Sequence, residues 1–184
     1  MARPRKYDSE IALQKIMEAF WEHGFESTSL ANLVATTGMQ KGSLYGAYGD
    51  KDSMFQLALF EYDRVAVTGT IAKMEALSGR EAIALLLKAP ALSVEAGDRR
   101  GCLLCNTLGE YSALNEPAQN LADTSRSNLG DAIKSALERM DRSGGQSAKA
   151  LELLALYFGL RVMARGGVSA AEIRSVGDAA LGAL

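Results

Sequence analysis

The sequence has few of the residues that build disulfide, metal and redox sites. Its 184 residues include two cysteines, Cys102 and Cys105, and one histidine, His23. A disulfide scaffold or a four-ligand zinc site needs more of them, and no nucleophile is patterned with a base and an orienting group. We therefore expect no metal, no cofactor and no enzymatic activity.

Strand and membrane signals are also scarce. The chain shows no sustained alternation of β-branched and polar residues and no hairpin signal. No apolar run approaches the roughly 20 residues that cross a bilayer. The basic N-terminus is not followed by the apolar stretch and cleavage site of a secretory signal. The sequence predicts an all-α protein of the cytoplasm, without a membrane partner.

Positive charge is not in excess either. The chain has 20 Lys and Arg against 22 Asp and Glu, which gives a net charge of −2. A protein that binds DNA needs basic residues only on the surface that faces the phosphates, so composition neither supports nor excludes this function. The prediction of function therefore rests on the pattern of residues along the chain.

Helical periodicity predicts three helices in the first fifty residues. The first covers about 8–23. Two short helices follow, at about 30–36 and 40–48, and Gly38 breaks the chain between them. Two short helices joined by a tight glycine-containing turn are the layout of a helix-turn-helix unit. Residues 1–50 are therefore expected to form a DNA-binding domain.

Residues 51–184 predict a second, larger helical domain. A long helix is expected over about 51–77, and the segment from Ser78 to Glu81 has the pattern of a capping box that opens the next helix. Pro90 is expected to kink or end that helix, because proline has no backbone N–H to donate. With the helices that follow, about nine helices are predicted in the whole chain.

The last two predicted helices, about 147–165 and 169–184, carry apolar residues on more than one face. One face can pack on the rest of the subunit. The other is best explained by a second copy of the chain across a two-fold axis. We expect a homodimer that forms through these two helices.

A sequence motif runs through the first three predicted helices and into the fourth. Its segments are AFWEHGFESTSLANLV at 19–34, GMQKGSLY at 38–45 and GDKDSMF at 49–55. Together they resemble the DNA-binding signature of the tetracycline-repressor (TetR) family. The resemblance implies a transcriptional repressor that binds a palindromic site in double-stranded operator DNA as a homodimer. It also implies that a small-molecule effector binds within 51–184 and releases the DNA.

The resemblance assigns the third helix to the major groove, with its N-terminal residues nearest the bases. Gln40 is expected to pair with adenine, and Lys41 with guanine or a phosphate. Gly42 has no Cβ and lets the backbone approach the DNA, and Ser43 lies beside it. The motif usually has bulkier residues after its tyrosine than Gly46 and Ala47, which leaves the choice of bases open.

The remaining DNA contacts implied by the resemblance go to phosphates, which position the domain without reading sequence. They are expected from Thr28, Ser29, Tyr45 and Lys51. The basic residues before the first helix form either an arm along the DNA or a tail without contact; they are Arg3, Arg5 and Lys6.

For the effector, polar and sulfur-containing side chains of the second domain are the candidates, and ordinary packing is the alternative for each. They are Tyr62, Cys102, Cys105, Asn106, Glu110, Tyr111 and Tyr157. The two cysteines form a C-x-x-C at a predicted helix start, where the helix dipole lowers a thiol pKa. They are therefore either a redox or electrophile sensor or small buried residues.

Two other classes of protein are weighed against a regulator. A thiol–disulfide oxidoreductase built on Cys102 and Cys105 would need a βαβ context, and no strand is predicted. A purely structural helical dimer would leave the pattern from Lys41 to Tyr45 unexplained. The regulator is the prediction that accounts for both domains.

Overall fold

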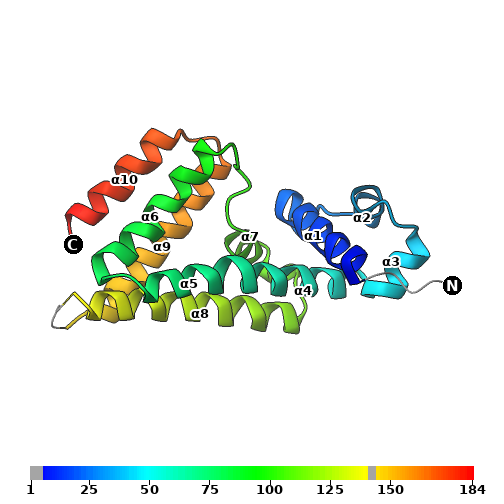
Figure 1. Ribbon diagram of the computed structural model, residues 1–184, viewed down its shortest axis with the longest axis horizontal. Helices are drawn as coiled ribbons and strands as arrows, with labels where there is room; N and C mark the ends of the chain where they lie inside the picture. The colour runs from blue at the N-terminus through cyan, green and yellow to red at the C-terminus, as the bar shows by residue number, and fades with distance from the viewer. Residues whose placement is uncertain (1–5, 141–143) are drawn as a thin grey trace.

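The computed structural model of the chain describes residues 6–140 and 144–184, and every regular element within them is helical (Figure 1). A π-helical segment, η1 (Asp63–Val67), joins α4 to α5, and a 3-10 turn, η2 (Tyr111–Ala113), follows α7. The predicted all-α class is confirmed. The α-helices are α1 (Lys6–His23), α2 (Leu30–Thr37), α3 (Lys41–Tyr48), α4 (Lys51–Tyr62), α5 (Thr68–Glu75), α6 (Gly79–Glu95), α7 (Leu103–Gly109), α8 (Glu116–Glu138), α9 (Gln146–Arg165) and α10 (Ala170–Gly182).

The helices form two groups that one long rod connects. Helices α1–α3 lie together at one end of the molecule, and α6, α9 and α10 lie at the other (Figure 1). The rod made of α4, η1 and α5 runs between them, packing on α1 at one end and along α8 for much of its length. We call residues 6–48, which contain α1–α3, the head, and the described residues from 51 onward the body.

The two short helices of the head begin and end where their sequence signals predict. Ser29 caps α2 by accepting a hydrogen bond from the N–H of Asn32, and Gly38 ends it in the left-handed conformation, with φ at 72°. Glycine adopts this conformation at little cost because it has no Cβ. Asp50 caps α4 in the same manner, through the N–H of Ser53 at 2.8 Å. The helix-turn-helix layout is confirmed.

The long helix predicted over 51–77 is present as a continuous rod with one irregularity. Within η1, the N–H of Thr68 bonds to the carbonyl of Asp63, five residues earlier, in place of four. Such π segments are rare and frequently lie at functional sites. The apolar pattern did not reveal it, because one wide turn barely disturbs the spacing of apolar residues on either side.

Helix α6 excludes one of the two outcomes expected for Pro90, the end of the helix. The helix does not end there but continues to Glu95, and Pro90 is buried within it. Proline removes one backbone hydrogen bond. Burial of apolar residues on both sides of it, Leu86 and Leu87 before and Ala91 and Val94 after, stabilises the helix enough to continue.

One hydrophobic core extends through head and body. At their boundary, the ring of Phe20 on α1 meets Phe55 on α4 edge to face, with centroids 5.1 Å apart, and Phe25 lies 5.0 Å from Phe55. Each such pair contributes about 0.5–1.5 kcal/mol beyond burial. The head is therefore packed firmly on the start of the rod. None of the described helices is long and apolar enough to cross a membrane.

Candidate DNA interface and effector chamber

Helix α3 presents one face to the core and the rest to solvent. Leu44 is fully buried, and the Tyr48 hydroxyl donates to the backbone carbonyl of Ser9 on α1 at 2.8 Å. These two residues fix the position of the helix. The side of α3 that remains exposed carries every residue predicted to lie near the bases, together with the predicted phosphate contact Tyr45; these are Gln40, Lys41, Gly42, Ser43 and Tyr45.

Two glycines on α3 are not required by the packing of the chain. A Cβ added at Gly42 or at Gly46 would meet nothing within 4 Å. Both positions are exposed, as is Ala47 between Gly46 and Tyr48. At these positions no long side chain projects from the outer surface of α3, which leaves room for a large ligand close to the backbone. Close approach of DNA at Gly42 stays a prediction.

The structure corrects the role expected of Thr28. Its side chain is fully buried, and its hydroxyl donates to the carbonyl of Gly24 at 2.6 Å, which closes the turn between α1 and α2. The hydroxyl is thus not available to a phosphate. The neighbouring Ser29 is exposed at the start of α2, where its side chain serves as the helix cap.

Lys51 lies at the start of α4, half-buried against the same turn. Its Nζ donates to the carbonyl of Glu26 at 3.2 Å and lies 4.6 Å from the centre of the Phe25 ring. Lys51 therefore joins the rod to the α1–α2 turn in the described structure, and a phosphate contact stays a prediction. Arg3 and Arg5 lie outside the described residues.

Two charged side chains of the body hold the end of α1. Arg165 on α9 donates to the carbonyls of Trp21 at 3.0 Å and Glu22 at 2.7 Å, which are among the carbonyls left free at the C-terminus of a helix. The Glu110 carboxylate accepts from the N–H of Phe25 at 2.6 Å and of Glu26 at 3.3 Å. Glu110 was predicted to bind the effector, and the structure corrects this to a contact with the head.

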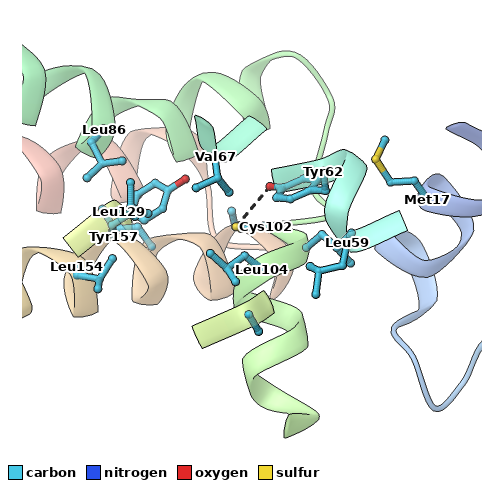
Figure 2. Packing of buried hydrophobic residues seen from close by; sticks show 14 of the residues in the cluster. Met17, Leu59, Tyr62, Val67, Leu86, Cys102, Leu104, Leu129, Leu154 and Tyr157 are labelled. Carbon is cyan, nitrogen blue, oxygen red and sulfur yellow. Dashed lines mark hydrogen bonds between the residues drawn. The ribbon is translucent and has the colours of Figure 1, made fainter. Parts of the chain in front are cut away.

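A small, partly enclosed chamber lies between the rod and helices α7, α8 and α9. Figure 2 shows several of the side chains around it. Its volume is about 40 Å³. Three of the predicted effector residues, Tyr62, Cys102 and Tyr157, line it, and the Tyr62 hydroxyl donates to the Cys102 sulfur at 3.4 Å. The structure adds the side chains that the sequence prediction missed: Ala66, Val67, Thr70, Leu104, Leu129 and Arg161.

Arg161 supplies the charge of this chamber. Its Nε donates to the Tyr157 hydroxyl at 3.1 Å, and its Nη1 donates to the Ser93 hydroxyl at 2.9 Å. Burial raises the pKa of Tyr157 to about 12 and raises that of Tyr62 well above its usual value. Both phenols are therefore neutral at physiological pH. The one available sequence signal was the four-residue spacing of Tyr157 and Arg161, which places them on one helix face.

The other predicted effector residues do not line the chamber. The Cys105 thiol points to the Phe158 carbonyl, with 3.7 Å between sulfur and oxygen, and burial raises its pKa to about 12. The Asn106 amide donates to the Arg100 carbonyl at 3.1 Å. The Tyr111 hydroxyl donates to the Asp123 carboxylate at 2.6 Å. These side chains form structural contacts in and around α7.

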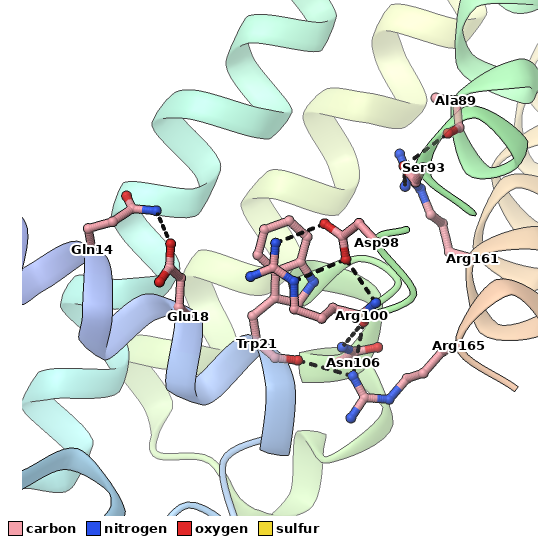
Figure 3. A network of polar contacts seen from close by, with 10 residues as sticks. All are labelled: Gln14, Glu18, Trp21, Ala89, Ser93, Asp98, Arg100, Asn106, Arg161 and Arg165. Carbon is pink, nitrogen blue, oxygen red and sulfur yellow. Dashed lines mark hydrogen bonds and ion pairs between the residues drawn. The ribbon is translucent and has the colours of Figure 1, made fainter. Parts of the chain in front are cut away.

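A chain of ring contacts runs from the chamber to the head. Tyr62 lies edge to face against Trp21 on α1, with centroids 5.0 Å apart. The Arg100 guanidinium lies 3.9 Å over the same indole ring and is held by Asp98 in a bidentate pair (Figure 3). Tyr62 therefore touches the chamber through its hydroxyl and the last turn of α1 through its ring.

A larger cleft of about 590 Å³ opens beside this junction, lined by Glu22, Asp98 and three arginines. The arginines are all engaged. Arg100 pairs with Asp98, Arg165 donates to backbone carbonyls, and Arg99 donates to the carbonyl of Val168 at 3.1 Å. A cleft that is open and whose arginines are already engaged offers a ligand fewer free donors than a more enclosed chamber does. We therefore take the chamber as the candidate effector site.

The head thus exposes the second helix of its helix-turn-helix unit, and the helical body to which it is attached contains a small chamber. The family model for bacterial regulatory proteins of the tetR family matches residues 12–58. The head and the start of the rod therefore carry the DNA-binding domain of the TetR family.

Two curated relatives illustrate the match. The transcriptional repressor ComR of Escherichia coli is 45% identical over 65 residues, which is 35% of this chain and 31% of ComR. The chain therefore matches about a third of that protein. An uncharacterized regulator of Bacillus subtilis, YezE, is 26% identical over 158 residues, or 85% of this chain and 81% of YezE.

Two solved structures share the whole fold. A cysteine-substituted variant of the TetR-family regulator CifR, solved with 26-bp double-strand operator DNA, is 25% identical with a TM-score of 0.84 over 98% of both chains. A TetR-family regulator from Agrobacterium tumefaciens is 19% identical with a TM-score of 0.88, covering 97% of this chain and 98% of that one. The two-part architecture is therefore common to these proteins.

Proposed function

We propose that this chain is a transcriptional repressor that binds palindromic operator DNA as a homodimer and releases it when a small molecule occupies the body. The observation that carries the proposal is the open face of α3, which is held from behind by Leu44 and Tyr48. We place the boundary between the DNA-binding domain, residues 1–50, and the effector-binding and dimerisation domain, residues 51–184, at the start of the rod. An operator-binding protein works in the cytoplasm.

DNA contact is proposed for the N-terminal turn of α3 and the cap of α2. Gln40 and Lys41 would reach base edges, while Ser29, Tyr45 and Lys51 would contact phosphates. The solved structure of the CifR variant with operator DNA supports this arrangement, since that protein has the same fold and is 25% identical.

Dimerisation is proposed through α9 and α10. These helices carry apolar side chains that the body leaves exposed: Leu151 at 63%, Val162 at 57%, Met163 at 39% and Val176 at 39%. Gly159 is also exposed on α9, and a Cβ there would meet nothing within 4 Å of the chain itself. A second copy packed on this surface would bury the apolar groups and give the mid-helix glycine a packing role.

Effector release is proposed to act through the Tyr62–Trp21 contact. A chamber of about 40 Å³ is too small for most effectors, so binding has to move its walls, among them Tyr62 and η1. Such a movement shifts the rod and the end of α1 together. The two α3 helices of a dimer must lie about 34–36 Å apart to enter successive major grooves, so an effector that favours another spacing releases DNA by population shift.

The proposed function is tested by selecting bound sequences from a pool of random duplexes with the purified full-length chain. We expect enrichment of a palindromic sequence, fluorescence anisotropy that fits binding of dimers, and light scattering that gives twice the chain mass. A chain that stays monomeric at micromolar concentration and enriches no sequence would contradict the proposal.

Thiol sensing is a second candidate function. Of the two cysteines, Cys102 is the better candidate for the sensing residue because it lines the chamber. Cys102 lines the chamber and accepts a hydrogen bond from Tyr62, whereas the raised pKa of Cys105 keeps that thiol protonated and unreactive. If Cys102 is the sensor, Cys102→Ser abolishes loss of DNA binding on treatment with oxidant, and Cys105→Ser does not. The oxidoreductase is not proposed, since the described residues contain no strand for a βαβ unit.

A further inference from the structure

The chamber is rich in hydrogen-bond donors and poor in acceptors. The Tyr157 hydroxyl accepts from Arg161, which leaves its own proton free to donate inward. Tyr62 and Thr70 add two more hydroxyls, and both phenols keep their protons because burial raises their pKa values. The Tyr62 hydroxyl donates to the Cys102 sulfur, a weak acceptor that a carboxylate oxygen can replace. No carboxylate or amide side chain lines the chamber to accept from these groups.

Arg161 also lacks an acidic partner. No carboxylate of the described residues forms an ion pair with it within 4.0 Å. Asp98 lies on the loop beyond α6, and Arg161 is the weakest of the groups that lower its pKa. Both Asp98 oxygens accept hydrogen bonds from Arg100. A cation taken from water is costly unless an opposite charge or good hydrogen bonds compensate it. Among the described residues, the charge of Arg161 is thus compensated by two hydroxyl groups and by the Tyr157 ring, whose centre lies 5.2 Å from the guanidinium carbon, and not by a carboxylate.

The other walls of the chamber are aliphatic. Ala66, Val67, Leu104 and Leu129 face the same space. Apolar walls of this kind favour an apolar body on any ligand that enters. The two kinds of wall together select a molecule with a negative head at Arg161 and a short hydrocarbon body.

We propose that the effector of this regulator is a small organic anion, a carboxylate with a short aliphatic body, held by the Arg161 guanidinium and the hydroxyls of Tyr62 and Tyr157. The inference rests on the proposed function in treating the chamber as the effector site. Arginine binds a carboxylate through two parallel hydrogen bonds, which supplies both charge and orientation. The lining thus specifies the sign of the ligand's charge and the apolar character of its body.

The test uses isothermal titration of the purified full-length chain with straight-chain carboxylates from acetate to valerate, each paired with its neutral amide. We expect saturable binding of at least one carboxylate and at least about tenfold weaker binding of its amide, which is the effect of losing one charge-assisted contact. An amide that binds as tightly as its carboxylate, or no carboxylate binding at about 10 mM, would overturn the proposal.

Variants connect the binding to Arg161. Arg161→Gln should lose the preference for carboxylate over amide, and Arg161→Lys should keep part of it, because lysine retains the charge but not the two-pronged geometry. Arg126→Gln on α8 is the matched control; that side chain is 43% exposed and lies outside the chamber. If circular dichroism shows that Arg161→Gln is unfolded, the proposal is tested with Arg161→Lys and with the comparison of carboxylate and amide. An unchanged preference in a folded Arg161→Gln overturns the proposal.

A parallel titration of the selected operator separates this inference from the proposed function. Carboxylate binding that leaves DNA affinity unchanged supports the ligand class and contradicts release by effector. Normal operator binding with no carboxylate binding leaves the proposed DNA function intact and overturns the ligand class. Carboxylate binding that persists in Arg161→Gln but is lost in Cys102→Ser also overturns it, since the anion would then be recognised through the thiol.

Discussion

In the head, the side chains proposed to contact bases come from the first turn of one eight-residue helix, and all of them are exposed. In the body, the chamber is assembled from the rod and from α7, α8 and α9, and Tyr62, Cys102 and Tyr157 are each less than a tenth exposed. The contrast follows from the ligands, because DNA is bound on an outer surface whereas a small molecule has to be enclosed. We therefore expect substitutions on the head surface to change stability less than substitutions in the chamber.

The largest expected effect comes from breaking the support of α3. Leu44→Ala removes a fully buried side chain and should lower the free energy of unfolding by about 2–5 kcal/mol. Urea unfolding followed by circular dichroism measures this, and operator binding should weaken with it. Leu92→Ala, at a site 56% exposed, is the control and should change stability by no more than about 0.5 kcal/mol. Equal losses in the two variants would contradict the inward orientation of α3.

The next largest effect tests the chamber through pH. Burial raises the pKa of Tyr157 from 10.0 to about 12, so between these values the unfolded chain releases a proton that the folded chain keeps. The free energy of unfolding therefore falls as pH rises through this window, by up to about 3 kcal/mol. Urea unfolding at about pH 9 and about pH 11.5 measures the fall. Tyr157→Phe should reduce it, and an undiminished fall in this variant would contradict burial of the phenol.

A smaller effect is expected from the exposed residues of α3, and it separates base reading from phosphate contact. Gln40→Ala should lower affinity for the selected operator by about 1–3 kcal/mol and relax the preference at one base pair. Lys41→Ala should reduce the salt dependence by about one unit if the lysine meets a phosphate. Anisotropy titrations at several salt concentrations measure both. Lys73→Ala on α5, also exposed, is the control, and an equal change in it would contradict a local contact.

The same contrast explains how far the sequence could be interpreted. The helices of the head were predicted to within about two residues, because caps such as Ser29 and stops such as Gly38 act locally. Thr28 was predicted to contact a phosphate, but its hydroxyl donates to the Gly24 carbonyl. That contact depends on how the turn folds, which the residue type does not reveal. Local signals thus located the interface but not every contact in it.

The chamber was only partly predictable for a physical reason. Tyr62, Cys102 and Tyr157 were chosen by residue type, and they meet because three helices pack together. Arg161 was missed, since its four-residue spacing from Tyr157 is a weak signal. Arg165, a further four residues along the same helix, binds the head instead. Glu110, chosen as an effector ligand, holds the α1–α2 turn. Which charge faces inward depends on long-range packing that the pattern of one helix does not contain.

The smallest expected effect concerns the junction where head and body meet. It tests whether ligand binding in the body changes DNA binding by the head. Glu110→Gln leaves one carbonyl oxygen to accept from Phe25 or Glu26 but places an N–H₂ group against the other N–H. We expect operator affinity to fall about twofold to tenfold, the effect of one lost hydrogen bond, because the head is held less firmly relative to the rod.

Carboxylate binding to the chamber should be unchanged in Glu110→Gln, since Glu110 does not line it, while the loss of operator affinity on adding carboxylate should become smaller. Anisotropy titrations with and without carboxylate measure both quantities in one series. Glu138→Gln, at an exposed site on α8, is the matched control. If Glu110→Gln leaves the effect of carboxylate on DNA binding intact, the coupling passes through the other contacts between head and body, such as that of Tyr62 with Trp21, and the Glu110 contact serves only to hold the fold.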